Sequence, residues 1–311
     1  MSYAFVFPGQ GAQSVGMLSE MAQSYPQVRH TFEEASDALG YDLWSLTQNG
    51  PDTALNQTEK TQPAMLTAGV AVYRVLADQV ELKPDAMAGH SLGEYTALTV
   101  AGTWSLADAV KLVALRGRLM QDAVPQGEGA MAAILGLDDE AVVELCAQAA
   151  QDEVCEAVNF NSPGQVVIAG NRDAVARAQQ LAEARGAKRV VPLPVSVPSH
   201  CSLMKPAAEK LGEALADLPM NPPSVPVLHN IDAAPRTSVA SVREALINQL
   251  YQPVQWVRTI EQMKADGVER LLELGPGKVL TGLNRRIDRR MPITPVLDPA
   301  SVEAALQQLE E

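Results

Sequence analysis

The chain has 311 residues, of which 47% are hydrophobic, so it can bury a sizeable core in one large domain or two ordinary ones. Its net charge of −13 argues against nucleic acid as a partner, because phosphate binding needs a net basic face. No apolar run approaches the roughly 20 residues that cross a bilayer, and no signal-peptide pattern opens the chain, so we expect a cytoplasmic protein without membrane contact.

The first part of the chain alternates strands with helices. We expect a buried strand at 3–7, a helix at 62–80, a strand at 85–89, a helix from about 92 and another at 106–123. Pro63 would lie near the start of its helix, where the missing N–H of a proline costs little. The alternation predicts a mostly parallel sheet with helices on both faces.

The middle third has a different order of elements. We expect a strand at 130–137, a helix at 139–150, strands at 154–160 and 165–170, a helix at 172–186 and a strand at 188–193. This βαββαβ order is the ferredoxin-like pattern, and stretches rich in proline and glycine flank it, as linkers often do. We therefore predict an inserted subdomain at 126–195, within a larger domain formed by 1–125 and 196–311.

The larger pattern resumes in the last third. We expect a helix at 202–217, a strand at 225–228, helices at 238–250 and 256–266, a strand at 268–274 and a helix opened by 275–278.

A serine stands between two glycines where the strand at 85–89 passes into a helix. The run "GHSLG" at 89–93 fits the G-x-S-x-G pattern in the strand-turn-helix context that this motif requires. Small residues on both sides let the backbone turn sharply while the hydroxyl of Ser91 projects at the carboxyl edge of the sheet. A serine before a helix can also be a simple N-cap. The context favours Ser91 as a nucleophile.

A serine nucleophile needs a base, and the chain has four histidines. His90 is the immediate neighbour of Ser91, so its side chain should point elsewhere; His30 lies in a charged helical stretch. His229 ends a strand, which is a weak indication of a cleft. His200 lies where a strand-like segment ends at a proline and a helix begins, and it is our candidate general base. The sequence alone supplies no orienting carboxylate for a triad.

Six motifs in order resemble one known family. They are "FVFPGQGAQ" at 5–13, "GHSLGEY" at 89–95, "LRGRLMQ" at 115–121, "NFNSPGQVVIAG" at 159–170, "VSVPSHCSLM" at 195–204 and "ELGPGKVLTGL" at 273–283. Their order and spacing are similar to those of the malonyl-CoA:acyl carrier protein transacylases, above all the stand-alone bacterial enzymes of fatty acid synthesis. The resemblance covers essentially the whole chain. It implies an α/β-hydrolase-like domain of parallel strands with a ferredoxin-like insert, which agrees with the pattern above.

The resemblance also implies roles for individual residues. In this family a backbone carbonyl holds the second nitrogen of the histidine, and the matching residue here is Gln249. Two backbone N–H groups would stabilise the oxyanion. One belongs to Leu92, by its position after the nucleophile at a helix N-terminus, and the other to Gln10, by resemblance.

Arg116 carries the expectation about the substrate. In an amphipathic helix such as 110–124 an arginine is ordinarily a solvated residue. The resemblance instead places Arg116 in the acyl pocket, where a guanidinium binds the free carboxylate of a malonyl group through two parallel hydrogen bonds. Met120, one helical turn further, would line the same pocket or belong to the ordinary core.

The expected activity is that of an [acyl-carrier-protein] S-malonyltransferase. Ser91 would take the malonyl group from malonyl-CoA and pass it to the phosphopantetheine thiol of acyl carrier protein, in ping-pong fashion. We expect no cofactor; the three cysteines, Cys146, Cys155 and Cys201, have no paired spacing that would predict disulfides or a metal site. A monomer is expected. Because carrier proteins of this pathway are acidic, the basic clusters at 285–290 and 185–189 are candidate docking surfaces.

Two other classes of function stay open at this point. A thioesterase or acylesterase would share Ser91 and His200 but would not need Arg116. A scaffold that only binds acylated carrier proteins would never form an acyl-serine.

Overall fold

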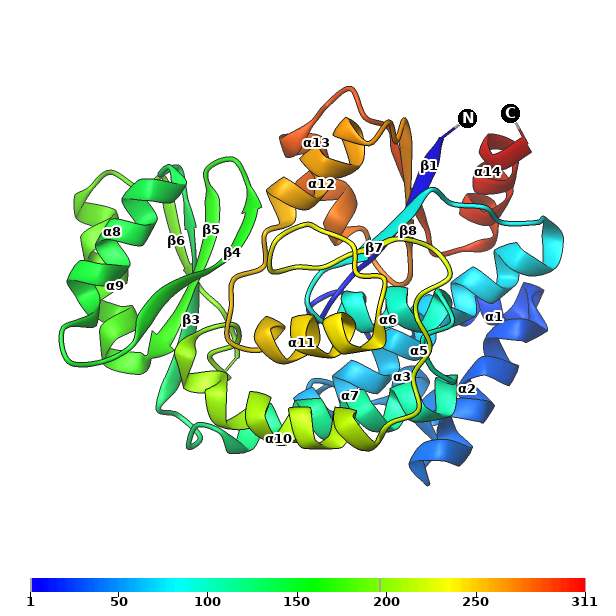
Figure 1. Ribbon diagram of the computed structural model, residues 1–311, viewed down its shortest axis with the longest axis horizontal. Helices are drawn as coiled ribbons and strands as arrows, with labels where there is room; N and C mark the ends of the chain where they lie inside the picture. Colours follow the sequence, from blue (N-terminus) through cyan, green and yellow to red (C-terminus); the bar gives the residue numbers. More distant parts are fainter. Residues whose placement is uncertain (1, 196, 311) are drawn as a thin grey trace.

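Five parallel strands form the central sheet of the protein, in the order β7-β2-β1-β8-β9 (Figure 1). The computed structural model describes residues 2–195 and 197–310. The strands are β1 (Tyr3–Phe7), β2 (Ala86–Gly89), β7 (Val227–Leu228), β8 (Arg270–Leu274) and β9 (Ile293–Val296). All of them point the same way, so their carboxyl ends share one edge of the sheet.

Helices cover both faces of this sheet, and the alternation of side chains along β1 shows why. Phe5 and Phe7 belong to one core cluster, whereas Ala4 and Val6 belong to another. The first cluster packs the sheet on helices that include α2 (Pro26–Leu39), α5 (Thr58–Gln79), α6 (Leu92–Val100), α7 (Leu106–Asp122), α10 (Lys205–Asp217), α11 (Val239–Gln249) and α14 (Pro299–Glu310). The second packs it on α12 (Trp256–Ala265) and α13 (Val279–Ile287). A strand buried on both faces is a near-continuous apolar run.

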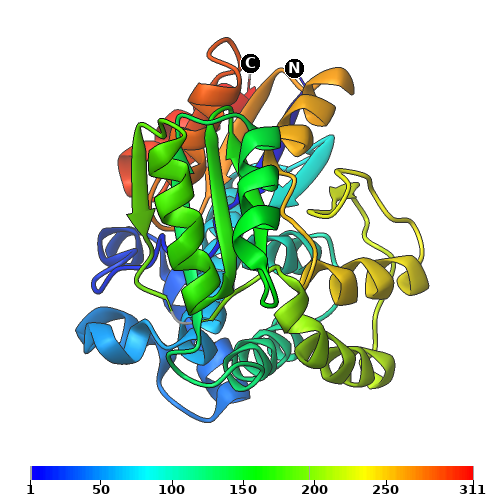
Figure 2. The same cartoon turned by 90° about the vertical axis from the view of Figure 1, so that its left-hand side faces the viewer.

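The subdomain between α7 and α10 contains an antiparallel sheet of order β4-β5-β3-β6. Its elements are β3 (Gly129–Leu135), α8 (Asp139–Ala150), β4 (Cys155–Ser162), β5 (Gln165–Asn171), α9 (Arg172–Ala184) and β6 (Arg189–Pro192). Both helices lie on the outer face of the sheet (Figure 2). Ala132 and Ile134 pack against them, and Met131 and Ala133 on the opposite side of β3 face the larger part of the molecule.

The fold class expected from the sequence is confirmed, with a parallel sheet and a βαββαβ insert. The division into domains at 125 and 196 stays a prediction, and residues 1, 196 and 311 lie outside the described residues. The expected helix at 202–217 opens as a 3-10 turn, Ser202–Met204, before α10. The periodicity does not indicate the short elements α1 (Ser19–Ser24), α3 (Leu43–Asn49), α4 (Asp52–Leu55) and β9, nor the longer C-terminal helix α14.

The expectation for Pro63 is wrong. The apolar periodicity predicts a helix start near Pro63, but α5 begins at Thr58 and Pro63 lies inside the helix. The first turn of α5 is made of polar residues, so the apolar periodicity begins later than the helix does. This turn matters for the site, because the backbone of Thr58 contacts α7 at Gly117, where an added Cβ would lie 2.7 Å from the Thr58 carbonyl oxygen.

No helix within residues 2–195 and 197–310 is long and apolar enough to cross a membrane.

Candidate active site

Ser91 lies on a sharp turn between the carboxyl end of β2 and the first residue of α6. Its φ is 50° and its ψ −107°, a backbone conformation that a residue with a side chain rarely adopts. The flanking glycines make the turn possible because neighbouring backbone leaves no room for a side chain. A Cβ on Gly89 would lie 1.8 Å from the carbonyl carbon of Gly93, and a Cβ on Gly93 would lie 2.0 Å from the Phe7 carbonyl oxygen. The hydroxyl is thereby held at the edge of the sheet.

His200 is hydrogen-bonded to this serine. Its Nε2 lies 2.8 Å from the Ser91 Oγ, and its Nδ1 lies 2.7 Å from the backbone carbonyl oxygen of Gln249. A carbonyl oxygen only accepts, so Nδ1 carries the proton and Nε2 has a free lone pair toward the hydroxyl. In this tautomer the imidazole can take the proton of Ser91 as the oxygen attacks a carbonyl carbon.

The environment of His200 opposes its protonation. Burial, the positive charge of Arg116 and the ring of His90 lower the pKa of His200 to about 3, against a smaller raising effect of the hydrogen bond to Gln249. The base is therefore neutral throughout the physiological pH range. A backbone carbonyl also stabilises an imidazolium less than a carboxylate would.

Arg116 is buried beside the serine, with only 1% of its surface exposed. Its Nη1 donates to the Gln62 side chain at 2.8 Å, and its Nη2 donates to the Ser91 Oγ at 3.3 Å and to the Gln249 Oε1 at 3.1 Å. The guanidinium carbon also lies 5.0 Å from the ring centre of Tyr95. Within the described residues every one of these partners is neutral, and Nε has no hydrogen-bond partner. A buried cation without an anion is costly, so the site is prepared for an anionic ligand.

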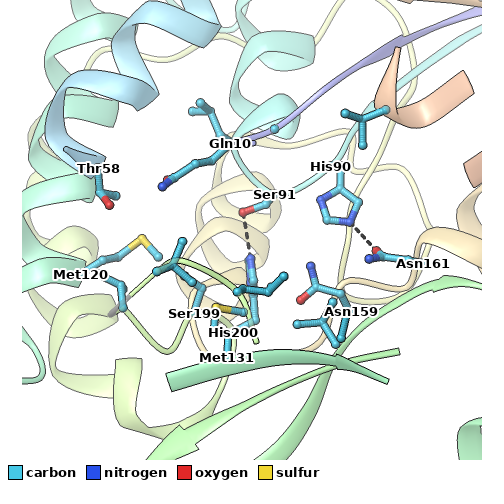
Figure 3. A pocket seen from close by; sticks show the side chains of 18 of the residues that line it. Gln10, Thr58, His90, Ser91, Met120, Met131, Asn159, Asn161, Ser199 and His200 are labelled. Carbon is cyan, nitrogen blue, oxygen red and sulfur yellow. Dashed lines mark hydrogen bonds between the residues drawn. The ribbon is translucent and has the colours of Figure 1, made fainter. Parts of the chain in front are cut away.

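A cavity of about 320 Å³ opens onto Ser91 and His200 (Figure 3). Its lining includes Met131 and Ala133 of β3 and, from the segments that follow β1 and β2 of the central sheet, Gly9 and His90. Met120 also lines it and at the same time belongs to the main core cluster, so the structure fits both alternatives that the sequence left open for this residue.

Gln10 and Leu92, the two expected oxyanion donors, both line this cavity. The N–H of Leu92 is the first of α6, and an N–H at that position has no acceptor within its own helix. The loop that carries Gln10 approaches the serine turn so closely that a Cβ on Gly9 would lie 2.4 Å from the His90 carbonyl oxygen. Gly11 is required for another reason: nothing lies within 4 Å of its Cβ position, but its φ of 107° is in the left-handed region that favours glycine.

The other histidines lie away from the serine hydroxyl. The Nε2 of His90 is 2.7 Å from the Asn161 Oδ1, and the two side chains point toward each other in Figure 3. Burial lowers the pKa of His90. His30 is exposed. The strand end at His229 weakly indicates a cleft, but His229 does not line the cavity. It is fully buried, with Nδ1 2.7 Å from the Glu94 carboxylate.

Three site residues were not singled out from the sequence. Gln62 holds Arg116, and Asn230 accepts the backbone N–H of Ser91 through Oδ1 at 2.7 Å. Glu94 is fully buried and accepts a hydrogen bond from the Asn230 backbone. A signal for Glu94 was present, since it is the one charged residue in the run "LGEYTALTV", and a buried carboxylate needs partners.

The two basic clusters lie differently with respect to the cavity. The cluster at 285–290 begins on α13, which lines the cavity, and its Arg286 donates to Gln165, another lining residue, at 2.8 Å. The cluster at 185–189 follows α9, and its Arg185 is hydrogen-bonded to Gln148 of α8. The first cluster is thus in contact with a lining residue of the cavity, whereas no residue of 185–189 lines it.

Nothing among the described residues groups three or more His, Cys, Asp or Glu side chains in a way that could hold a metal ion.

Comparison with known proteins gives a consistent result. Residues 4–291 match the family model described as "Acyl transferase domain". The chain is 58% identical over 305 residues to the malonyl CoA-acyl carrier protein transacylase of Escherichia coli K12, covering 98% of this chain and 99% of that protein.

Solved structures agree with this similarity. An acyl carrier protein S-malonyltransferase from Vibrio cholerae superimposes with a TM-score of 0.96 at 56% identity, covering 98% of this chain and 100% of that one. A malonyl-transacylase in complex with a type II PKS acyl-carrier protein superimposes with a TM-score of 0.98 at 52% identity, covering 99% of this chain and 100% of that one.

Proposed function

This chain belongs to the acyl transferase domain family, among the malonyl CoA-acyl carrier protein transacylases, and we propose how its own residues perform their reaction. The protein transfers a malonyl group from malonyl-CoA to acyl carrier protein. The observation that carries our assignment is a buried guanidinium without an anion, 3.3 Å from a serine oxygen that is itself 2.8 Å from a neutral imidazole. A malonyl thioester fits this arrangement of guanidinium, serine and imidazole. Its thioester carbonyl would lie at the serine and its free carboxylate at the guanidinium.

In the first half-reaction Ser91 attacks the thioester carbonyl carbon of malonyl-CoA. The serine proton moves to the His200 Nε2, which the Gln249 carbonyl oxygen has prepared by holding the proton on Nδ1. The developing oxyanion faces the N–H groups of Gln10 and Leu92. The carbon–sulfur bond then breaks, the leaving sulfur takes the proton from His200, and free coenzyme A leaves a malonyl ester on Ser91.

The second half-reaction runs the same steps with a different thiol. The phosphopantetheine thiol of acyl carrier protein gives its proton to His200 and attacks the malonyl ester. The serine oxygen leaves and recovers the proton from His200. A thiolate is a good leaving group in the first half-reaction, and a thiol gives up its proton more readily than an alcohol in the second. Both steps therefore need a weaker base than amide cleavage does, which is compatible with the carbonyl oxygen of Gln249 in place of a carboxylate.

Arg116 selects the acyl group in this proposal. Its Nη1 donates to the Gln62 Oε1 and its Nη2 to the Gln249 Oε1, and Nε and the remaining N–H groups are left for the substrate carboxylate. A malonyl carboxylate would receive charge-assisted hydrogen bonds and would neutralise the buried cation. An acetyl group offers neither.

Acyl carrier protein is the partner, and we propose that it docks over the cluster at 285–290. Arg286 of this cluster contacts the cavity-lining residue Gln165, and Arg285 and Arg286 are exposed in a chain whose net charge is −13. A local basic patch of this kind lets an acidic carrier approach an acidic enzyme. A monomer that acts in the cytoplasm without a cofactor and without contact to nucleic acid or membrane stays part of the proposal.

The test of this function is a transfer assay with malonyl-CoA and holo acyl carrier protein, read by mass spectrometry of the carrier. Malonyl-carrier should accumulate with the wild type and not with Ser91→Ala or His200→Ala. If malonyl-CoA is consumed while free malonate rather than malonyl-carrier accumulates, the protein is a thioesterase and the proposal is wrong.

A further inference from the structure

Glu94 is a fully buried carboxylate behind the nucleophile, in the first turn of α6. It accepts hydrogen bonds from the Asn230 backbone N–H at 2.8 Å and from the Gln249 Nε2 at 3.1 Å, and its other oxygen lies 2.7 Å from the His229 Nδ1. The first two groups can only donate, and both donate to Oε2. With the proton of His229 on Nδ1, all three contacts reach a carboxylate that only accepts, so an ionised Glu94 fits this site.

The side chain of Gln249 lies between this carboxylate and Arg116. Its Nε2 donates to Glu94 and to the Ser91 carbonyl oxygen at 2.9 Å, and its Oε1 accepts from the Arg116 Nη2 at 3.1 Å. Turning the amide over would place an oxygen against two acceptors and an NH₂ group against a cation. The amide orientation is therefore fixed by an anion at one end and a cation at the other.

Glu94 is thus an indirect counter-charge for Arg116, because the Gln249 side chain lies between them. A carboxylate in direct contact would pair with the guanidinium through two parallel hydrogen bonds and occupy the donors that a substrate carboxylate needs. With Gln249 as a spacer, Glu94 offsets part of the cost of burying the cation and leaves the guanidinium open toward Ser91.

We propose that Glu94 is a positioning residue that sets the acyl specificity of the site by orienting the Gln249 side chain, and with it Arg116. The inference rests on the proposed role of Arg116 as the clamp for the malonyl carboxylate. A second contact of Glu94, to Asn230, supports the Ser91 turn, because Asn230 accepts the Ser91 N–H. An effect through Asn230 alone would change transfer of every acyl group by the same factor.

The experiment measures the rate of acyl-serine formation from limiting malonyl-CoA and from limiting acetyl-CoA. The variants are Glu94→Gln, Gln249→Met and the double variant; methionine removes the amide and keeps the backbone carbonyl that faces His200. We expect the malonyl-to-acetyl ratio to fall about tenfold in Glu94→Gln, the effect of losing one hydrogen bond to a charged group. In the Gln249→Met background the same change should alter the ratio less than about twofold, because the link is already gone.

The matched control is Glu273→Gln, which alters another fully buried carboxylate. Glu273 accepts from the backbone of Leu280 and from the backbone and hydroxyl of Thr281, and it contacts neither Gln249 nor Arg116. Its malonyl-to-acetyl ratio should match the wild type. Equal losses for both acyl groups in Glu94→Gln, or independent effects in the double variant, would overturn the inference. If Glu94→Gln does not fold, an unchanged ratio in Gln249→Met overturns it as well. A wild type that forms no malonyl adduct would instead refute the proposed function.

Discussion

Replacing Arg116 by methionine should convert the protein from a malonyl-selective to an acetyl-preferring transferase. Methionine is unbranched and of similar length, so it fills most of the buried volume while removing the charge and every donor. The change also relieves the cost of a cation that is 1% exposed and has only neutral partners within the described residues.

The size of the effect follows from the contacts that the substrate carboxylate would lose. Two hydrogen bonds to a charged group contribute about 3 to 6 kcal/mol. At about 1.4 kcal/mol for each factor of ten, the kcat/KM for malonyl-CoA should fall by about two to four orders of magnitude. The kcat/KM for acetyl-CoA should stay within about tenfold of the wild type, because the acetyl group makes none of these bonds.

The assay is single-turnover acylation followed by rapid-quench mass spectrometry, with both coenzyme A esters and with wild type as reference. Thermal unfolding shows whether the variant is folded. Because the charge of Arg116 is one cause of the low pKa of His200, the acid limb of acetyl transfer should also move to higher pH in the variant. Equal losses for malonyl and acetyl groups would refute the reasoning, since they would mean that Arg116 supports the structure and does not bind a carboxylate.

Three further predictions concern pH, the serine turn and docking. The acylation rate of the wild type at limiting malonyl-CoA should stay constant from about pH 8 to about pH 5, because a pKa of about 3 keeps His200 neutral. With a histidine of ordinary pKa the rate would fall about thirty-fold over this range, and a fall of that size would contradict the assignment. Gly93→Ala should destabilise the fold severely in thermal unfolding, because its Cβ would lie 2.0 Å from a backbone oxygen, whereas Gly282→Ala, with nothing within 4 Å, should not. Reversing the charge of Arg285 and Arg286 should slow transfer to the carrier about tenfold and leave acylation by malonyl-CoA unchanged; equal slowing of both steps would exclude docking there.

Most of the fold could be predicted because its elements carry strong local patterns. The apolar run at 3–7 forms β1, and the periodic stretch from 106 forms α7. Elements were missed where local patterns are weak. The helices α1, α3 and α4 are four to seven residues long, and β9 has four residues and is held by its neighbour β8.

Only part of the site could be predicted from the sequence, and the reason is different for each residue. Ser91 carries a local motif, because its turn requires the glycines beside it. The partners of that turn come from distant parts of the chain: Asn230 is 139 positions away and Gln249 is 158. No local pattern specifies such contacts. The role of the Gln249 backbone was expected from family resemblance, whereas the bonds of its side chain to Arg116 and Glu94 are visible only in the folded chain.

The central claim is that the malonyl group is carried on Ser91, and the most direct measurement is the intact mass of the protein after brief mixing with malonyl-CoA. The account predicts one malonyl adduct per chain, mapped to Ser91 by peptide sequencing, absent in Ser91→Ala and discharged when holo acyl carrier protein is added. An adduct that persists in Ser91→Ala, or malonyl-carrier formed without any adduct, would contradict it.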